Sequence, residues 1–388
     1  MFEIIESQAN GTLIKVVGVG GAGGNAVDHM IRNGVTGVDF VVCNTDAQAL
    51  ARCGAKQQIQ LGASGLGAGA KPDAGRAAAQ EQREAIREAL TGANMVFITA
   101  GMGGGTGTGA APVVAEVAKE LGVLTVAVVT KPFAFEGKRM RVAETGLAEL
   151  AQHVDSLIVI LNERLMEVLG EDVSMRDAFR AADGVLHNAV AGIAEIINCP
   201  GLVNVDFEDV RTVMGEMGMA MMGSAYASGV DRARIAAEQA VASPLLEGVN
   251  LAGARGVLVN ITASEGLKMR EVNEVMNTVR GFAAEDATII FGAVYDDTVA
   301  DNLRVTVVAT GLGQPQLAQK AKPQPQLVVS RTGTDHHHHH AFAAPVDYGA
   351  IESAPAVFRR NRASAIEALQ QNGVDKYDIP AFLRKQAD

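Results

Sequence analysis

Gly101-Met-Gly-Gly-Gly-Thr-Gly-Thr-Gly109 lies between an apolar run, 95–100, and an alanine- and valine-rich run from Ala110 onward. This order predicts a strand, a glycine loop and a helix. Six glycines in nine positions let backbone amides approach a ligand closely, and Thr106 and Thr108 add hydroxyl groups. With the first turn of the helix, these amides form a site for a phosphate group. The loop does not end in Gly-Lys-Ser/Thr, so it is not a Walker A P-loop.

Composition narrows the class of protein. A length of 388 residues suggests two or three domains, and a hydrophobic fraction of 48% is enough for sizeable cores. The formal net charge of -11 argues against direct binding to nucleic acid or to an anionic membrane. We see neither the basic-then-apolar start of a signal peptide nor an apolar run of about 20 residues. Three scattered cysteines, Cys43, Cys53 and Cys199, are typical of reduced thiols, so we expect a soluble cytoplasmic protein.

Strands and helices alternate through the first part of the chain. We predict strands at 13–19, 38–43, 58–61, 95–100, 123–130 and 157–161, and helices at 26–32, 73–90, 110–121 and 141–152. This alternation indicates a mostly parallel, Rossmann-like sheet covered on both faces. Two more glycine-rich segments, 20–25 and 65–70, follow predicted strands. All three glycine segments should therefore meet where the carboxyl ends of the strands open into a crevice.

A long helix and a second α/β unit are predicted next. Apolar residues at helical spacing run over 175–198, which corresponds to more than about 30 Å, and Cys199-Pro-Gly201 ends the pattern. Helices at 206–217, 232–242 and 268–282 then alternate with strands at 256–262, 288–294 and 303–309. The methionine-rich run 214–222 is interpreted as core filling, with a pliable protein contact as the alternative.

The end of the chain has a different composition. A proline- and glutamine-rich stretch after residue 312 predicts a disordered linker, in which the histidines 336–340 are a spacer or an added tag. In the terminal segment, Asp378 can cap a short helix whose Ile379, Phe382 and Leu383 share one face. Such a short apolar stripe does not fold alone, so we expect it to bind in a partner's groove.

Glycine loops suggest a nucleotide as the ligand. Gly18-Val-Gly-Gly-Ala-Gly23 fits the Gly-x-Gly-x-x-Gly fingerprint, so a nicotinamide-dependent oxidoreductase is one alternative. Three glycine loops around one crevice better suit a nucleoside triphosphate with Mg²⁺ sharing its charge. After the strand at 123–130, Glu136 can accept ribose hydroxyls and Arg139 can bind a phosphate.

Two pairs of side chains complete the list of candidates. Phe179 and Asp183 share a helix face, so Phe179 can stack on a base while Asp183 accepts hydrogen bonds from the paired donors of guanine. An equally open interpretation is that Phe179 is a core residue and Asp183 a solvated carboxylate. Asp206 and Asp209 also share a face and can orient a water for attack on phosphorus, although an acidic helix start is the simpler explanation. The long helix separates these two acids from the glycine loops, which is too far for one subunit.

Several motifs in the correct order resemble those of the tubulin/FtsZ family. Gly103–Gly109 resembles its signature, Gly65-Leu-Gly-Ala-Gly-Ala-Lys-Pro72 also matches, and Asn204-x-Asp206-x-x-Asp209 is similar to its synergy-loop motif. The terminal segment 378–388 is similar to the tail peptide of bacterial members rather than to tubulin. The resemblance covers about 11–312 and the tail.

The resemblance implies a GTPase whose active site is shared between neighbouring subunits of a head-to-tail filament. It implies nucleotide contacts at Gly21, Ala22, Gly23, Gly24, Asn25, Ala68, Gly69, Ala70, Gly104, Gly105, Thr106, Gly107, Glu136, Arg139, Asn162, Phe179 and Asp183. The catalytic residues implied are Asn204, Asp206 and Asp209, which a second subunit supplies. The implied ligands are GTP or GDP with Mg²⁺. A non-catalytic cytoskeletal scaffold remains an alternative of a different class.

The resemblance also implies a domain organisation and partners. The expected parts are a GTP-binding domain at 11–174, a central helix at 175–199, a smaller α/β domain at 200–312, a disordered linker at 313–374 and a tail peptide at 375–388. The tail would recruit membrane adaptors such as FtsA and ZipA to a division ring at mid-cell. Some positions depart from the family pattern, among them Lys71 and Leu161, and the phosphate contact of Arg139 could belong to Lys138.

Overall fold

The computed structural model describes residues 12–170, 172–198, 203, 205–216, 218–243, 254–284, 286–296 and 299–312. All of them lie in one compact unit, Met1–Ala321. Asn204, the Cys199-Pro-Gly201 break, the linker 313–374 with its histidines, and the tail 375–388 lie outside the described residues.

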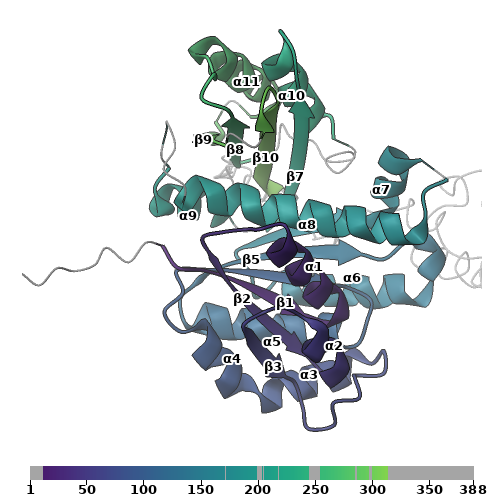
Figure 1. Ribbon diagram of the computed structural model, residues 1–388. Coiled ribbons are helices and arrows are strands. Elements are labelled where there is room, and N and C mark those ends of the chain that lie inside the picture. Colours follow the sequence, from purple (N-terminus) through teal and green to yellow (C-terminus); the bar gives the residue numbers. More distant parts are fainter. Residues whose placement is uncertain are drawn as a thin grey trace, which may run out of the picture. The chain divides into compact units, whose positions relative to one another are not determined.

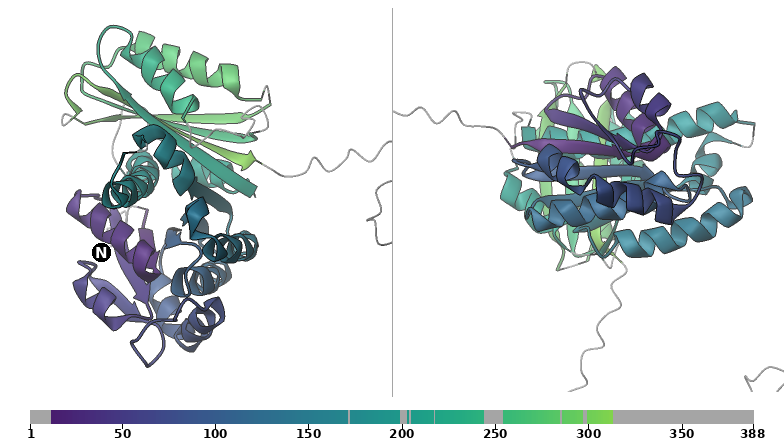
Figure 2. Two further views of the ribbon diagram at one scale, coloured as in Figure 1. Left: turned by 90° about the vertical axis from the view of Figure 1, so that its right-hand side faces the viewer. Right: turned by 90° about the horizontal axis from the view of Figure 1, so that it is seen from below.

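The N-terminal part is a parallel sheet with helices on both faces (Figures 1 and 2). Its strands are β1 (Ile14–Val19), β2 (Val38–Asn44), β3 (Gln57–Gln60), β4 (Met95–Gly101), β5 (Leu124–Lys131) and β6 (Ser156–Leu161), in the order β3-β2-β1-β4-β5-β6. Its helices are α1 (Gly20–Arg32), α2 (Ala47–Arg52), α3 (Pro72–Glu81), α4 (Arg83–Leu90), α5 (Thr106–Glu120), α6 (Lys138–Leu150) and α7 (Asn162–Leu169), with a 3-10 turn η1 (Ala134–Glu136). The predicted fold class is confirmed.

Side chains alternate between the two faces of the sheet along each strand, and this alternation builds two cores. Val16 on β1, Phe97 on β4 and Val126 on β5 lie side by side and point to one face, where they pack with α1. Their chain neighbours, such as Val17 and Ile98, point to the other face, where α4 and α5 cover them. Because both faces are buried, these strands are continuous apolar runs in the sequence.

The long helix α8 (Met175–Asn198) has the predicted bounds. It lies between the N-terminal sheet and the C-terminal part (Figure 1). Leu186, Val190 and Ile193 share a core with residues from both. At 1.5 Å per residue, its 24 residues span about 36 Å.

The C-terminal part contains α9 (Phe207–Met214), β7 (Gly218–Ala227), α10 (Arg232–Val241), β8 (Gly256–Ala263), α11 (Met269–Phe282), β9 (Thr288–Tyr295) and β10 (Leu303–Leu312). Strand β10 pairs antiparallel with β7 and β8, and β8 pairs parallel with β9. A short parallel pairing of β6 with β7, from Ser156↔Gly218 to Ile158↔Ala220, makes all the described strands one ten-stranded sheet. A separate apolar core fills the space under α10 and α11.

Several local expectations were wrong. Helices α1 and α5 begin at Gly20 and Thr106, so glycines assigned to loops form their first turns. The helix expected at 73–90 is interrupted at Gln82. Besides the short turn η1, two elements were not predicted. One is α2, which Asp46 caps by accepting from the amides of Gln48 and Ala49. The other is β7, which begins inside the methionine run, where Met221 and Met222 are buried as core filling predicts, whereas Met219 is 43% exposed.

Candidate active site

The central glycine loop connects β4 to α5 under tight steric limits. Gly103 has φ +96°, and a Cβ on it would lie 2.7 Å from both the Arg139 oxygen and Pro132 Cγ, so a side chain does not fit. Buried Thr108 accepts a hydrogen bond from the Gly103 amide at 2.8 Å, which fixes the loop from inside. Thr108 therefore shapes the loop, although the sequence suggested that it could donate to a ligand.

The second glycine segment lies directly beside the first. A Cβ on Gly20 would be 2.9 Å from the Gly107 amide nitrogen, and one on Gly23 would be 2.3 Å from the Thr99 oxygen. Glycine at position 20 lets the first turns of α1 and α5 come together, and glycine at position 23 lets α1 pack closely against β4. Two helix N-termini then present free amides and the positive ends of their dipoles to one place, which favours an anion.

The third loop packs against the central one. A Cβ on Gly105 would lie 2.8 Å from the Lys71 amide nitrogen and 2.9 Å from Ala68 Cβ. Ala70 adopts φ +57°, which is uncommon for a residue with a side chain. The three glycine segments therefore meet as the sequence predicted.

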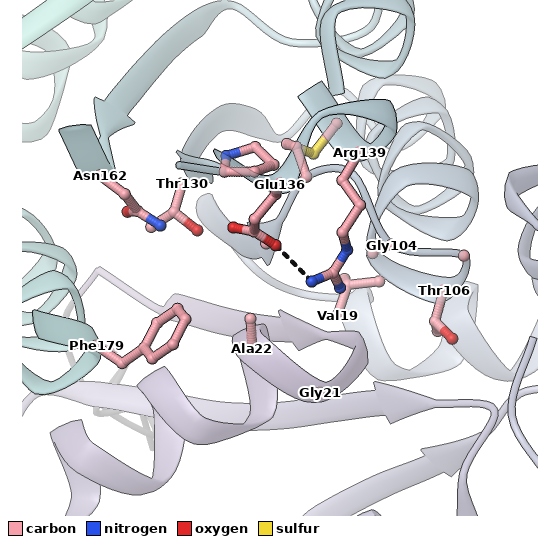
Figure 3. Close-up of a pocket in the computed structure, with 15 residues that line it drawn as sticks. Val19, Gly21, Ala22, Gly104, Thr106, Thr130, Glu136, Arg139, Asn162 and Phe179 are labelled. Atoms are coloured by element: carbon pink, nitrogen blue, oxygen red, sulfur yellow. Dashed lines mark hydrogen bonds and ion pairs between the residues drawn. The ribbon is translucent and has the colours of Figure 1, made fainter. Parts of the chain in front are cut away.

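A cavity of about 250 Å³ opens beside the glycine loops (Figure 3). It is lined by Val19, Gly21, Ala22, Gly101, Met102, Gly104, Gly105, Thr106, Gly107, Thr130, Pro132, Glu136, Arg139, Asn162 and Phe179. Ten of these were predicted to contact the nucleotide, whereas Gly23 and residues 68–70 line neither this cavity nor the adjoining one described below. Sequence reasoning missed Val19, Thr130 and Pro132. The feature that could have identified these three residues is their position at the carboxyl ends of β1 and β5.

Glu136 and Arg139 form one wall of this cavity. They make an ion pair of 2.6 Å (Figure 3), and Glu136 also accepts from the Phe133 amide at 3.1 Å. The Arg139 side chain is 59% exposed, so its remaining N–H groups can reach a ligand. Lys138 does not line the cavity, which favours Arg139 for the phosphate contact.

Asn162 begins α7 and is only 4% exposed. Its Oδ1 has no hydrogen-bond partner within the described part of the chain. A buried acceptor left unpaired costs free energy, so its position in the wall of the cavity suggests a donor from a ligand, such as a hydroxyl group.

A second cavity, of about 540 Å³, adjoins the first at Gly21. Asn25 and Asp183 line it from α1 and α8, and Phe179 one turn earlier on α8 lines the first cavity. Burial raises the pKa of Asp183 to about 6. Phe179 is 44% exposed and contacts Phe133 edge-on, so part of its ring remains available to a planar ligand between the two cavities.

Asp206 and Asp209 lie at the opposite end of α8 from both cavities. Asp206 is the N-cap of α9, and its Oδ1 accepts from the Asp209 amide at 2.8 Å. This hydrogen bond is the structural role expected of an acidic helix start. Both side chains are nevertheless exposed, which leaves carboxylate oxygens free. In the described ranges, no three acidic, histidine or cysteine side chains form a group able to hold a metal ion. None of the described helices is long and apolar enough to cross a membrane.

Comparison with known proteins gives consistent results. The profile of the tubulin/FtsZ family GTPase domain matches residues 13–170, and that of the FtsZ family C-terminal domain matches 218–313. The chain is 52% identical to the cell division protein FtsZ of Neisseria meningitidis over 398 aligned residues, covering 100% of this chain and 98% of that protein. The corresponding identity to FtsZ of Pseudomonas aeruginosa is 53%, with both chains fully covered.

Solved structures agree with the sequence matches. An FtsZ dimer from M. jannaschii is 44% identical, with a TM-score of 0.75 over 82% of this chain and 96% of that one. CetZ2 from Haloferax volcanii, 21% identical with a TM-score of 0.65 over 79% of this chain and 95% of that one, shares the fold. This chain belongs to the FtsZ family of tubulin-like GTPases.

Proposed function

We propose that this GTPase hydrolyses GTP only after head-to-tail assembly, because its active site is divided between two subunits. The glycine loops of one subunit bind the nucleotide, and Asp206 and Asp209 of the next subunit, with Asn204 beside them, activate the hydrolytic water. Filaments built this way would form the division ring at mid-cell, in the cytoplasm.

The separation of the two sets of residues carries this proposal. Phe179 and Asp183 are at the start of α8, beside the cavities, whereas α9 and its two acids follow its far end (Figure 1). The helix between them spans about 36 Å, and attack on phosphorus requires the reacting atoms within about 3.5 Å. In a head-to-tail stack, this length brings the acids of one subunit to the nucleotide of the next. Such an interface does not close, so it generates a filament.

Binding of the triphosphate would rest on backbone groups. Amides of residues 104–107 and those of Gly21 and Ala22 in the first turn of α1 can donate to phosphate oxygens, and the two helix dipoles lower the energy of the negative charge. Thr106, whose hydroxyl is 2.6 Å from that of Thr45, adds a side-chain oxygen to the same wall. Neutral oxygens of this kind fit Mg²⁺ held chiefly by the phosphates of the nucleotide. Bound there, Mg²⁺ would neutralise charge that develops on the phosphates.

The remaining residues would select guanosine. Asn162 Oδ1 and Glu136 can accept the ribose hydroxyls, and Arg139 can bind a phosphate. Phe179 would stack on the base while ionised Asp183 accepts from N1–H and N2–H₂ of guanine, a pair that adenine lacks.

The two acids would act on the water. Exposed carboxylates on the first turn of α9 can orient a water in line with the γ-phosphate and accept its proton as the bond forms. Asp206 is held in place by its hydrogen bond with the Asp209 amide. The nucleotide-binding subunit alone lacks this base, so it would bind GTP without hydrolysing it.

Asp183 predicts a pH dependence of nucleotide binding. Because its pKa in the free protein is raised to about 6, the carboxyl gains a proton as the pH falls through 6 and loses its ability to accept two bonds from guanine. We expect GDP affinity, measured by calorimetry, to fall about tenfold between pH 7.5 and pH 5.

Two variants identify the group responsible. Asp183→Asn should bind GDP weakly with no such pH dependence. His29→Gln, which changes another titratable residue in the wall of the second cavity, should keep the dependence. An unchanged pH profile in Asp183→Asn would contradict the assignment.

Self-association has support among the relatives, since an FtsZ from M. jannaschii was solved as a dimer. The tail 375–388 lies outside the described residues, and its apolar stripe supports a role in recruiting adaptors such as FtsA and ZipA. We also propose the division into parts at 11–174, 175–199, 200–312, 313–374 and 375–388.

Dilution tests the divided site. If two subunits make one site, phosphate release per subunit should rise steeply above a threshold protein concentration and be near zero below it. A self-contained site would instead give the same rate per subunit at every concentration. A filament that assembled equally on GTP and GDP without releasing phosphate would support the non-catalytic scaffold.

A further inference from the structure

Strand β2 is paired along only part of one edge. On its β1 side the ladder runs from Ile14↔Val38 to Val19↔Cys43, but on its β3 side it begins only at Val41↔Gln57. Strand β3 is the last strand on this side of the described sheet. Residues 38–40 therefore have an open edge, and such an edge offers backbone donors and acceptors to another extended segment.

A groove with an apolar floor runs beside this open edge. Its volume is about 420 Å³, and it is lined by Ile31, Val35, Val38, Asp39, Phe40, Gly54, Lys56 and Gln57. Four of these, Ile31, Val35, Val38 and Phe40, are partly buried and pack against the core below. An open strand edge over such a floor suits an extended peptide whose alternate side chains are apolar.

The start of this chain has that pattern and lies within reach. Strands β1 and β2 are parallel, so the chain enters β1 on the side of the sheet where residues 38–40 lie (Figure 1). The position next to β2 is two strand spacings from β1, about 10 Å. The eleven residues 1–11, which lie outside the described part, can extend over more than about 30 Å.

The residue types of this segment fit the groove. Phe2, Ile4 and, at the end of the segment, Glu6 fall on one side of an extended chain, with Glu3 and Ile5 on the other. Phenylalanine and isoleucine favour strands, and Lys56 at the groove can attract Glu3 or Glu6. Asn10-Gly11 is a turn sequence, which suits a reversal of direction before β1 begins.

We propose that residues 2–6 bind in the groove of their own chain, as a short strand antiparallel to β2 at residues 38–40. Phe2 and Ile4 face the apolar floor, and the backbone of the segment pairs with the open edge. Docking completes the sheet on this side and protects an edge on which another chain could pair.

Hydrogen exchange of the full-length protein with GDP, at a concentration below assembly, tests the proposal. In the wild type, those amides of residues 38–40 that point to the open edge, rather than to β1, should exchange slowly. In Ile4→Asp, which places a charge on the apolar floor, the same amides should exchange about tenfold faster or more. Ile5→Asp is the matched control, because the same change lies on the opposite side of the segment and should leave the protection intact.

A synthetic peptide of residues 1–8 provides the second arm. Added in excess to the Ile4→Asp protein, it should restore slow exchange at residues 38–40, and the same peptide carrying Ile4→Asp should not. Three results would overturn the proposal. These are fast exchange in the wild type, protection that Ile4→Asp leaves unchanged, and protection that appears only as protein concentration rises, which would indicate a second copy as the occupant.

Discussion

Replacing Asp209 with alanine is expected to lower GTP hydrolysis by about 100-fold or more while leaving GTP binding and assembly close to those of the wild type. The substitution removes an exposed carboxylate on the first turn of α9, far from the cavities, so it would remove the proposed base without changing the nucleotide site. Phosphate release, nucleotide affinity and sedimentation of filaments would be measured on the same preparation.

Asp206 needs a more careful variant, because it also caps α9. Asp206→Ala would lose the cap, at a cost of about 1 kcal/mol, together with the charge. Asp206→Asn keeps an oxygen that can accept from the Asp209 amide, so its loss of activity reports the charge alone. Glu208→Gln is the matched control, since Glu208 is an exposed acid on the same turn. Normal hydrolysis in Asp206→Asn and Asp209→Ala would contradict their catalytic role.

Gly105→Ala is expected to weaken GTP binding by about 100-fold or more, because displacing the loop would cost two or more hydrogen bonds from its amides to the charged phosphates, each worth about 1.5–3 kcal/mol. The added Cβ would lie 2.8 Å from the Lys71 amide nitrogen and 2.9 Å from Ala68 Cβ, so two of the three glycine segments must move apart. These contacts involve backbone, which cannot yield as a flexible side chain does.

Gly281→Ala is the control for this substitution. Gly281 lies on α11, nothing is within 4 Å of its Cβ position, and alanine favours helix more than glycine does. This variant should bind GTP as the wild type does and be as stable or slightly more so. Equal GTP affinity in Gly105→Ala and the wild type would contradict the close approach of the loops.

Much of the fold was predictable because its signals are local. Strands β1, β4 and β5 are buried on both faces, so they are unbroken apolar runs, and α8 has one apolar stripe of helical period over its full length. The predictions that failed concern features that depend on contacts between residues far apart in the sequence. Glycines 20 and 107 look like loop residues in the sequence, but they lie in the first turns of α1 and α5, and a Cβ on Gly20 would lie 2.9 Å from the Gly107 amide nitrogen. This close approach of two helices is a tertiary contact, so it has no local signal in the sequence. Strand β7 is defined by its pairing with β10, which no local pattern reveals.

The site was predictable to a similar extent. The composition of the glycine loops predicts a phosphate site, and helical spacing places Phe179 and Asp183 on one face of a helix. Thr130 and Pro132 were missed because nothing about their types suggests a ligand, and only the parallel register of β5 places them beside the glycine loops. The burial that raises the pKa of Asp183 depends on tertiary packing, so the sequence could not predict it.

Mixing two inactive variants tests the divided active site most directly. Asp209→Ala subunits would bind GTP but lack the base, and Gly105→Ala subunits would keep the base but bind GTP poorly. In a random equal mixture, about a quarter of the head-to-tail interfaces would join intact glycine loops to an intact Asp209. With sedimentation showing both variants in the filaments, the divided site predicts phosphate release near a quarter of the wild-type rate. A mixture as inactive as either variant alone would contradict it.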